Sequence, residues 1–240
     1  ERYKERETER VIHESLTAEN CARELQQRLR TLRMSDANME KGEMRVEANI
    51  SVSKDSNLGT KVEVKNLNSF KSVEAAIEYE IVRQVELLEK GEAVKQETRG
   101  WDENRSKTFV QRTKETAKDY RYFPDPDLPK MSIGKYESFS STRLSEKTPK
   151  LPNKKRIEYR NLGLVTEKIE VLLSNEELDA VAQRLLANGV GNETFGLAVN
   201  YLLTDITALQ IADECKVADL NIEAFEEMIS MLQSGEINSK

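Results

Sequence analysis

The residues best suited to chemistry lie between positions 35 and 70, where acids, bases and amides alternate with apolar side chains. Every second residue is apolar from Met44 to Val52, and the alternation returns around two valines at 62 and 64. The polar residues between them are Arg45, Glu47, Asn49, Ser51, Lys61, Glu63 and Lys65. A period of two is typical of strands that bury one face. Paired as a hairpin, these strands would form one polar surface suited to a metal ion and a polyanionic substrate.

The same alternation is also typical of a sheet that simply turns one face to solvent. Cross-strand ion pairs on such a face contribute only about 0.2–1 kcal/mol each. Spacing alone favours this second interpretation, and both alternatives stay open at this point.

Composition limits the classes of function that the chain can have. Its 240 residues allow one large or two modest domains, and 33% of them are charged. The sequence has no run of 18 apolar residues and no recognisable signal peptide, so we expect a cytoplasmic protein without a membrane span. Two cysteines give no disulfide framework, and a single histidine cannot make a histidine-based metal site. A net charge of −6 disfavours general nucleic-acid binding, so any RNA contact needs a local basic patch.

The remaining pattern predicts an α+β fold, with an antiparallel-sheet cradle portion followed by an all-helical domain. A helix over 16–33 precedes the first hairpin, and a helix with an apolar stripe from Phe70 to Leu88 follows it. A second hairpin is predicted at about 93–101 and 107–112, before an extended, proline-rich stretch over 119–129. After a linker-like passage, helices are predicted at 152–162, 165–173, 175–188, 191–209 and 222–232. The predicted domains are 1–137, 138–218 and 219–240.

A basic stretch opens the helical part of the chain. Seven cations fall within eighteen residues, against two glutamates: Arg143, Lys147, Lys150, Lys154, Lys155, Arg156 and Arg160. Such a stretch can neutralise several phosphates and make RNA binding depend on salt. A solvated linker and helix face is the commoner outcome for such a run, and both alternatives stay open.

Two literal strings go beyond composition and spacing. The first reads Ser-Asp-Ala-Asn-Met-Glu-Lys-Gly-Glu-Met-Arg-Val-Glu-Ala-Asn-Ile-Ser over 35–51 and continues as Gly-Thr-Lys-Val-Glu-Val-Lys-Asn-Leu-Asn-Ser-Phe over 59–70. The second comprises Gln-Glu-Thr-Arg at 96–99 and Asp-Tyr-Arg-Tyr-Phe-Pro-Asp-Pro-Asp-Leu-Pro at 119–129. Both closely resemble the B subunit of the tRNA-dependent amidotransferases, which convert Glu-tRNA(Gln) to Gln-tRNA(Gln) and Asp-tRNA(Asn) to Asn-tRNA(Asn).

The resemblance implies a reaction in three steps. A partner amidase subunit releases ammonia from glutamine. The B subunit then uses ATP and Mg²⁺ to phosphorylate the side-chain carboxylate of the misacylated amino acid, and ammonia delivered through a tunnel displaces the phosphate. The implied partners are this amidase (A) subunit, a small C subunit and misacylated Glu-tRNA(Gln) or Asp-tRNA(Asn), with no membrane.

The resemblance also implies roles for individual residues. The implied metal ligands are Glu47, at the family's metal-binding carboxylate position, and Glu40. The family often has Asp at the first of these positions, so the side chain here is one methylene longer. The implied catalytic residues are Glu47, Glu63, Lys65, Arg45 and Arg121; the implied cofactor-binding residues are Lys61, Asn49, Asp36, Asn38 and Asp125; and the implied tRNA-binding residues are Lys150, Lys154, Lys155, Arg156 and Arg160. An arginine fixed among acids also suits a phosphate or carboxylate ligand, which favours Arg121 and Asp125.

The family also carries a helix immediately before the first string. Upstream of that helix the resemblance stops, because the family's Glu-Val-His segment and its glutamate pair have no counterpart here. We therefore expect a fragment without the N-terminal half and most of the small tail domain, whose site is incomplete in this chain alone. No Gly-rich phosphate loop is present, so nucleotide binding rests on the resemblance. The alternative from another class is a non-catalytic scaffold that docks the amidase and binds tRNA. A secreted, glycan-active enzyme with paired carboxylates is disfavoured by the missing signal sequence.

Overall fold

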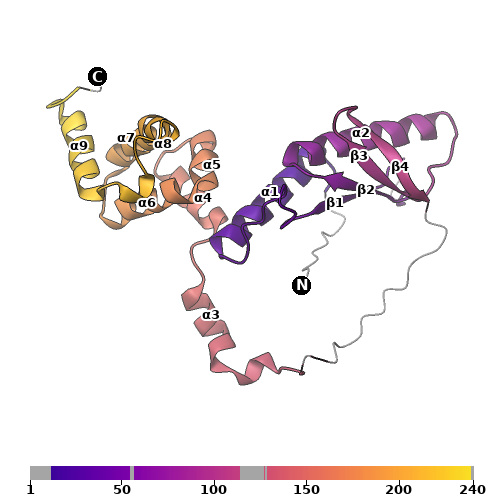
Figure 1. The fold of residues 1–240 in the computed structure, drawn as a ribbon, viewed down its shortest axis with the longest axis horizontal. Coiled ribbons are helices and arrows are strands. Elements are labelled where there is room, and N and C mark those ends of the chain that lie inside the picture. The colour runs from indigo at the N-terminus through magenta and orange to yellow at the C-terminus, as the bar shows by residue number, and fades with distance from the viewer. Residues whose placement is uncertain (1–11, 55–56, 114–126, 128, 239–240) are drawn as a thin grey trace. The chain divides into compact units, whose positions relative to one another are not determined.

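The computed structural model describes residues 12–54, 57–113, 127 and 129–238. The chain forms two compact units, residues 1–148 and residues 149–240. The first holds a sheet with helices, and the second is built from helices (Figure 1). The predicted α+β class is therefore confirmed. The boundary between the units lies in the predicted linker-like passage, and the division into three domains stays a prediction.

Among the described residues, four strands form one sheet in the order β1-β2-β3-β4: β1 (Val46–Ile50), β2 (Val62–Leu67), β3 (Glu97–Asp102) and β4 (Lys107–Thr113). The β1–β2 and β3–β4 pairs are antiparallel, as predicted. β2 and β3 instead pair parallel, with Glu63 opposite Thr98. The sheet is therefore mixed and not antiparallel throughout, because helix α2 (Phe70–Glu89) returns the chain across the sheet before β3 begins.

A β-bulge interrupts the first hairpin on its polar side. The register shifts around Glu47, which lies opposite both Lys65 and Asn66. Asn66 has a φ of 62°, a left-handed conformation that asparagine adopts more readily than most residues. The extra residue returns Leu67 to the buried face of the strand. The bulge thus keeps the apolar and polar faces of β2 separate along its whole length.

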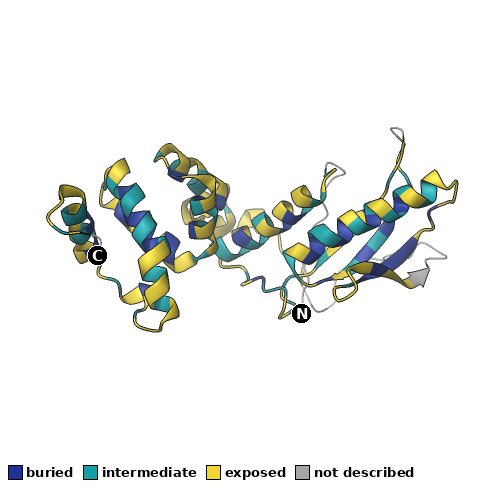
Figure 2. Cartoon of the chain, turned by 90° about the horizontal axis from the view of Figure 1, so that it is seen from above, coloured by how far each residue is buried: buried dark blue, intermediate teal, exposed yellow. Residues whose placement is uncertain are grey.

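Helix α2 covers one face of the sheet. Ser69 caps its first turn, because its Oγ accepts a hydrogen bond of 3.0 Å from the backbone N–H of Ser72. Within the predicted stripe Val73 and Ile77 are buried against the strands. Figure 2 shows the buried side of α2 facing the sheet and an exposed side facing away from it. Helix α1 (Ser15–Thr31) packs against α2.

The β3–β4 hairpin has two different faces. β3 begins at residue 97, later than the predicted 93. Glu97, Arg99 and Trp101 contact or lie beside residues of α2, whereas Thr98 and Gly100 lie on the opposite face. A Cβ at position 100 would lie 2.6 Å from the ring of Phe109 on β4, so a larger residue here would have to displace that exposed side chain.

Short helical elements follow in the last part of the first unit: η1 (Ile133–Lys135), η2 (Glu137–Phe139) and α3 (Ser141–Lys147). They and the residues before them expose several large apolar side chains, namely Met131, Ile133, Tyr136, Phe139 and Leu144. Residues 114–126 and 128, which include most of the proline-rich stretch, lie outside the described residues.

The second unit matches the predicted helices to within a few residues. Its elements are α4 (Pro152–Asn161), α5 (Thr166–Ser174), α6 (Glu176–Ala187), α7 (Asn192–Tyr201), the π-helical turn η3 (Leu202–Ile206), α8 (Thr207–Ile211), η4 (Val217–Asp219) and α9 (Ile222–Ser234). Gly163 and Gly189 follow α4 and α6 with φ angles of 90° and 83°, as expected of glycines that end helices. Tyr159 stacks on Phe195 in the core, with 5.8 Å between ring centres. No described helix has the length and apolar character needed to cross a membrane.

Candidate functional site

The sheet face opposite α2 brings together most of the residues predicted between 45 and 65. We call it the open face and define it by Arg45, Glu47, Asn49, Lys61, Glu63, Lys65 and Thr98. Lys65 Nζ donates a hydrogen bond of 3.1 Å to Glu47 Oε1 and lies 3.7 Å from Glu63 Oε1. Thr98 Oγ1 donates to the other Glu63 oxygen, Oε2, at 2.8 Å. These four side chains form a continuous polar chain across β1, β2 and β3.

The position of Lys65 between two carboxylates keeps it charged. Burial lowers the pKa of Lys65, but the hydrogen bond and charge of Glu47, with the charge of Glu63, outweigh burial and raise this pKa above its usual value. The Lys65 side chain is 36% exposed, so its ammonium is accessible to a ligand from solvent. This arrangement is suited to holding an anionic oxygen, such as that of a phosphate or a carboxylate.

Three other predicted residues of this face have side chains that are unpaired within the described part of the chain, and two of them are charged. Arg45, Asn49 and Lys61 are exposed, and their side chains have no hydrogen-bond or ion-pair partner among the described residues. Since two more cations join Lys65 on this face, positive charge exceeds the charge of its two carboxylates. The open face therefore combines acids that orient Lys65 with cations that face solvent.

The predicted residues upstream of β1 lie in a tight turn. Asn38 is used by the turn itself: its N–H donates to Glu43 Oε2, and its Oδ1 accepts from the N–H of Lys41, both at 3.0 Å. Asp36 and Glu40 are exposed. Within the described part of the chain, no hydrogen bond or ion pair joins these two acids to the carboxylates of the open face.

The described residues do not by themselves fit a magnesium ion. Mg²⁺ requires near-octahedral oxygen coordination, but the described part of the chain contains no group of three or more acidic, histidine or cysteine side chains that could hold a metal. Glu47 and Glu63 approach each other only through the ammonium that they share. Glu47 and Glu40 stay predicted ligands, and the predicted Arg121 and Asp125 lie outside the described residues.

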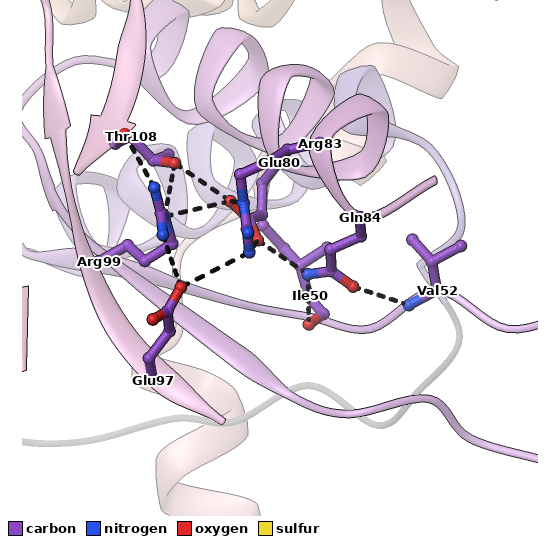
Figure 3. Close-up of polar contacts among 8 residues, drawn as sticks. All are labelled: Ile50, Val52, Glu80, Arg83, Gln84, Glu97, Arg99 and Thr108. Atoms are coloured by element: carbon purple, nitrogen blue, oxygen red, sulfur yellow. Dashed lines mark hydrogen bonds and ion pairs between the residues drawn. The ribbon is translucent and has the colours of Figure 1, made fainter. Parts of the chain in front are cut away.

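A second polar cluster lies on the other face of the sheet, beneath α2 (Figure 3). We call it the buried network; its residues are Glu80, Arg83, Gln84, Glu97, Arg99 and Thr108. Arg83 binds Glu80 through two hydrogen bonds of 2.9 and 2.6 Å. Arg99 donates to Glu97 Oε1 at 2.5 Å and to the hydroxyl of Thr108 at 2.7 Å. Two acids thus face two arginines inside the unit, so the buried charges compensate each other.

Gln84 connects the buried network to the end of β1. Its Nε2 donates to Glu80 Oε1 at 2.9 Å and to the carbonyl of Ile50 at 3.4 Å, while its Oε1 accepts from the N–H of Val52 at 3.1 Å (Figure 3). The amide therefore binds the edge strand as a neighbouring strand would. This contact joins the end of β1 to α2, in addition to the pairing of β1 with β2.

The buried network and the contact of Thr98 were not predicted from the sequence. Glu80 and Gln84 continue the helical spacing of Val73 and Ile77, so polar residues inside an apolar stripe were the available signal. Thr98 belongs to the Gln-Glu-Thr-Arg string, but its contact with Glu63 follows from the parallel pairing of β2 and β3. The Nε1 of Trp101 is buried without a hydrogen-bond partner among the described residues, and no sequence pattern indicated this.

The predicted tRNA-binding residues divide into two groups. Lys150, Lys155 and Arg156 form ion pairs with Glu158, Asp179 and Glu170 inside the second unit. Lys154 and Arg160 are exposed and have no ion-pair partner among the described residues.

A compact hydrogen-bond network holds the first of these groups. The Tyr159 hydroxyl donates to Asp179 Oδ1 at 2.6 Å, and Lys155 binds the other oxygen of Asp179. Burial, followed by the charge and hydrogen bond of Asp179, strongly raises the pKa of Tyr159. Burial raises the pKa of Glu158, but its hydrogen bonds to Lys150 and Gln183 outweigh this and lower the pKa below its usual value. These cations therefore have structural roles in joining α4 to α5 and α6.

The class of protein follows from comparing this chain with known families. Residues 5–138, which include the whole sheet and both faces described above, match the family model for the GatB/GatE catalytic domain. The chain belongs to this family.

Curated relatives agree with this assignment. The chain is 40% identical over 219 residues to the B subunit of the aspartyl/glutamyl-tRNA(Asn/Gln) amidotransferase of Thermus thermophilus, covering 90% of this chain and 46% of the relative. It is 37% identical over 237 residues to the B subunit of the chloroplastic/mitochondrial glutamyl-tRNA(Gln) amidotransferase of Physcomitrium patens, covering 97% of this chain and 41% of the relative. The chain therefore spans less than half the length of these relatives.

Proposed function

We propose that this chain forms part of the B subunit of a tRNA-dependent amidotransferase and contributes the open face to its active site. The observation that carries the proposal is the Lys65 ammonium shared by Glu47 and Glu63 within the matched catalytic domain. In this proposal the enzyme uses ATP and Mg²⁺ to activate the side-chain carboxylate of Glu-tRNA(Gln), Asp-tRNA(Asn) or both. Ammonia from a glutaminase subunit then completes the amide.

The side chains of the open face have separate roles in this proposal. Lys65, Arg45 and Lys61 bind and orient the anionic oxygens of ATP or of the acyl group, since cations at such a site offset charge that develops during phosphoryl transfer. Glu47 and Glu63 orient Lys65. The described residues do not assemble a complete metal site, so no step is assigned to Mg²⁺, and further ligands come from other parts of the enzyme.

The proposed partners follow from the names of the relatives as B subunits. They are the amidase (A) subunit, the small C subunit and the misacylated tRNA, in a cytoplasmic or organellar enzyme. A complete B subunit that contains this chain is therefore the form in which activity is tested.

The direct test is amidation of Glu-tRNA(Gln) and Asp-tRNA(Asn) by the heterotrimer with glutamine, ATP and Mg²⁺. We expect amide product on at least one tRNA, with no product when ATP is omitted. A complex that binds tRNA but forms no amide with either substrate contradicts the proposal.

The second candidate function is a scaffold that docks the amidase and binds tRNA without catalysis. It is favoured by one observation: the described residues lack a group of metal ligands. Titration of the heterotrimer with ATP, with and without Mg²⁺, separates the two functions. Magnesium-dependent ATP binding that is weakened at least about tenfold by Lys65→Met supports the catalytic proposal, whereas an unchanged or absent signal favours the scaffold.

A further inference from the structure

Thr98, like Asn49, has no role in the proposed reaction, yet its hydroxyl contacts Glu63 directly. It is 5% exposed, and its hydroxyl donates to Glu63 Oε2 at 2.8 Å. The parallel register places the two residues opposite each other on neighbouring strands. A hydrogen bond from a buried hydroxyl to a carboxylate is charge-assisted and stronger than one between neutral groups.

The two oxygens of Glu63 have different surroundings because of this contact. Oε2 is held by Thr98, whereas Oε1 lies 3.7 Å from Lys65 Nζ, beyond hydrogen-bond distance. Lys65 makes its hydrogen bond to Glu47 instead, at 3.1 Å. The orientation of the Glu63 carboxylate therefore decides how tightly Lys65 is held on the side of β2 and β3.

We propose that Thr98 is a positioning residue that holds the Glu63 carboxylate toward β3. Lys65 then stays loosely paired with Glu63 and is available to the phosphate oxygens of ATP. The inference rests on the proposed function. Without the hydroxyl, Glu63 has one donor fewer and draws Lys65 into a closer ion pair. ATP must then break that pair in order to bind.

The kinetic test compares Thr98→Val, which keeps the shape but removes the donor, with Thr98→Ser, which keeps the hydroxyl. Thr60→Val is the matched control, because Thr60 is exposed and lies just before β2, the strand that carries Glu63. In the complete heterotrimer we expect Thr98→Val to raise the KM for ATP about tenfold, with kcat changed less than about twofold. Thr98→Ser and Thr60→Val keep the wild-type KM within about twofold. Equal shifts in the valine and serine variants, or no shift in either, overturn the inference.

A second readout does not depend on catalysis. Competitive labelling with an amine-reactive reagent, read by mass spectrometry, compares Lys65 with the exposed Lys71 of α2 in the folded heterotrimer. We expect Thr98→Val to slow the labelling of Lys65 relative to Lys71 about threefold, because a closer ion pair keeps the amine protonated. An unchanged ratio overturns the inference. If the wild-type heterotrimer forms no amide but Thr98→Val still slows the labelling of Lys65 as expected, the role of Thr98 is supported and only the proposed function is contradicted.

Discussion

The surroundings of Lys65 are set by the fold of the sheet. Its two acidic partners come from different strands, and the bulge at Asn66 places it opposite Glu47. An exposed ion pair of this kind adds little to stability, since pairs in water are worth about 0–1 kcal/mol. The ion pair instead sets the position of a positive charge on the open face.

Replacing this charge gives the first prediction. Lys65→Met keeps the length of the side chain but leaves Glu47 and Glu63 without their shared cation. We expect the KM for ATP in the heterotrimer to rise by at least about tenfold, because one charge-assisted hydrogen bond to ATP is lost. Steady-state kinetics measure the change, with Lys71→Met at an exposed position of α2 as control. An unchanged KM for ATP would show that Lys65 does not meet this substrate.

At the scale of elements, the buried network joins α2 to the sheet through charges that have little access to water. Arg99 lies between Glu97 and Glu80, with Nε 3.6 Å from Glu80 Oε2. Removing one member of a buried group leaves its partners charged and uncompensated. Each charged member of the buried network therefore helps to hold α2 on the sheet.

The buried network gives a prediction with a matched control inside one hairpin. Arg99→Met should lower the free energy of unfolding of the first unit by about 3–5 kcal/mol, because two buried carboxylates lose a partner. Arg105→Met removes a 73% exposed arginine that pairs with Asp102, and should cost less than about 0.5 kcal/mol. Urea unfolding followed by the fluorescence of the buried Trp101 measures both. Equal effects of the two substitutions would contradict this role of the network.

Helical and strand periodicity predicted most of these elements from the sequence. The alternation around Glu47 and Glu63 correctly predicted an antiparallel pair with one polar face. The helices of the second unit were also placed to within a few residues, since their apolar stripes are regular. Local patterns suffice where one short-range rule decides the structure.

The contacts that join distant segments could not be predicted in this way. The parallel pairing of β2 with β3 is set by the crossover through α2, and it alone brings Thr98 to Glu63. The acids that bind Lys155 and Arg156 lie 24 and 14 residues away, on other helices. A run of cations in the sequence therefore does not show which of them form ion pairs in the fold.

The network around Tyr159 gives a pH prediction for the helical unit. Because its pKa is strongly raised in the fold, Tyr159 stays protonated above pH 10, where an unfolded tyrosine ionises. Unfolding then releases a proton, so stability falls as pH rises above about 10, by up to about 1.4 kcal/mol per pH unit. Circular dichroism of urea unfolding between about pH 9 and 11 measures this slope. Tyr159→Phe should flatten it, and a slope that persists in this variant would assign it to another group.

For the whole molecule, a net charge of −6 means that tRNA binding needs local positive charge. We propose that this charge comes from Lys154 and Arg160, which are exposed, while the paired Lys150, Lys155 and Arg156 hold the helices together. Paired lysines must break an ion pair before they contact phosphate. The tRNA-binding surface is then smaller than the sequence pattern indicated.

Salt dependence tests this division of the basic residues. The double variant Lys154→Ala/Arg160→Ala should reduce the slope of log affinity against log salt by about 1.4–1.8, since each lost phosphate contact accounts for about 0.7–0.9. Lys150→Ala, which removes a lysine paired with Glu158, should change the slope by less than about 0.5. Filter binding of tRNA to the heterotrimer at several salt concentrations gives both values. A larger change for Lys150→Ala would reverse the assignment.

In the proposed function, the open face forms part of the site of amidation. The most direct measurement is kcat/KM for amidation of Glu-tRNA(Gln) or Asp-tRNA(Asn), whichever the wild type uses, by heterotrimers carrying Glu47→Gln, with Glu86→Gln on exposed α2 as control. We predict a loss of about 100-fold or more for Glu47→Gln, with tRNA affinity and unfolding unchanged, and wild-type activity for the control. Amidation by Glu47→Gln within about twofold of wild type would contradict this role of the open face and place the reaction elsewhere in the enzyme.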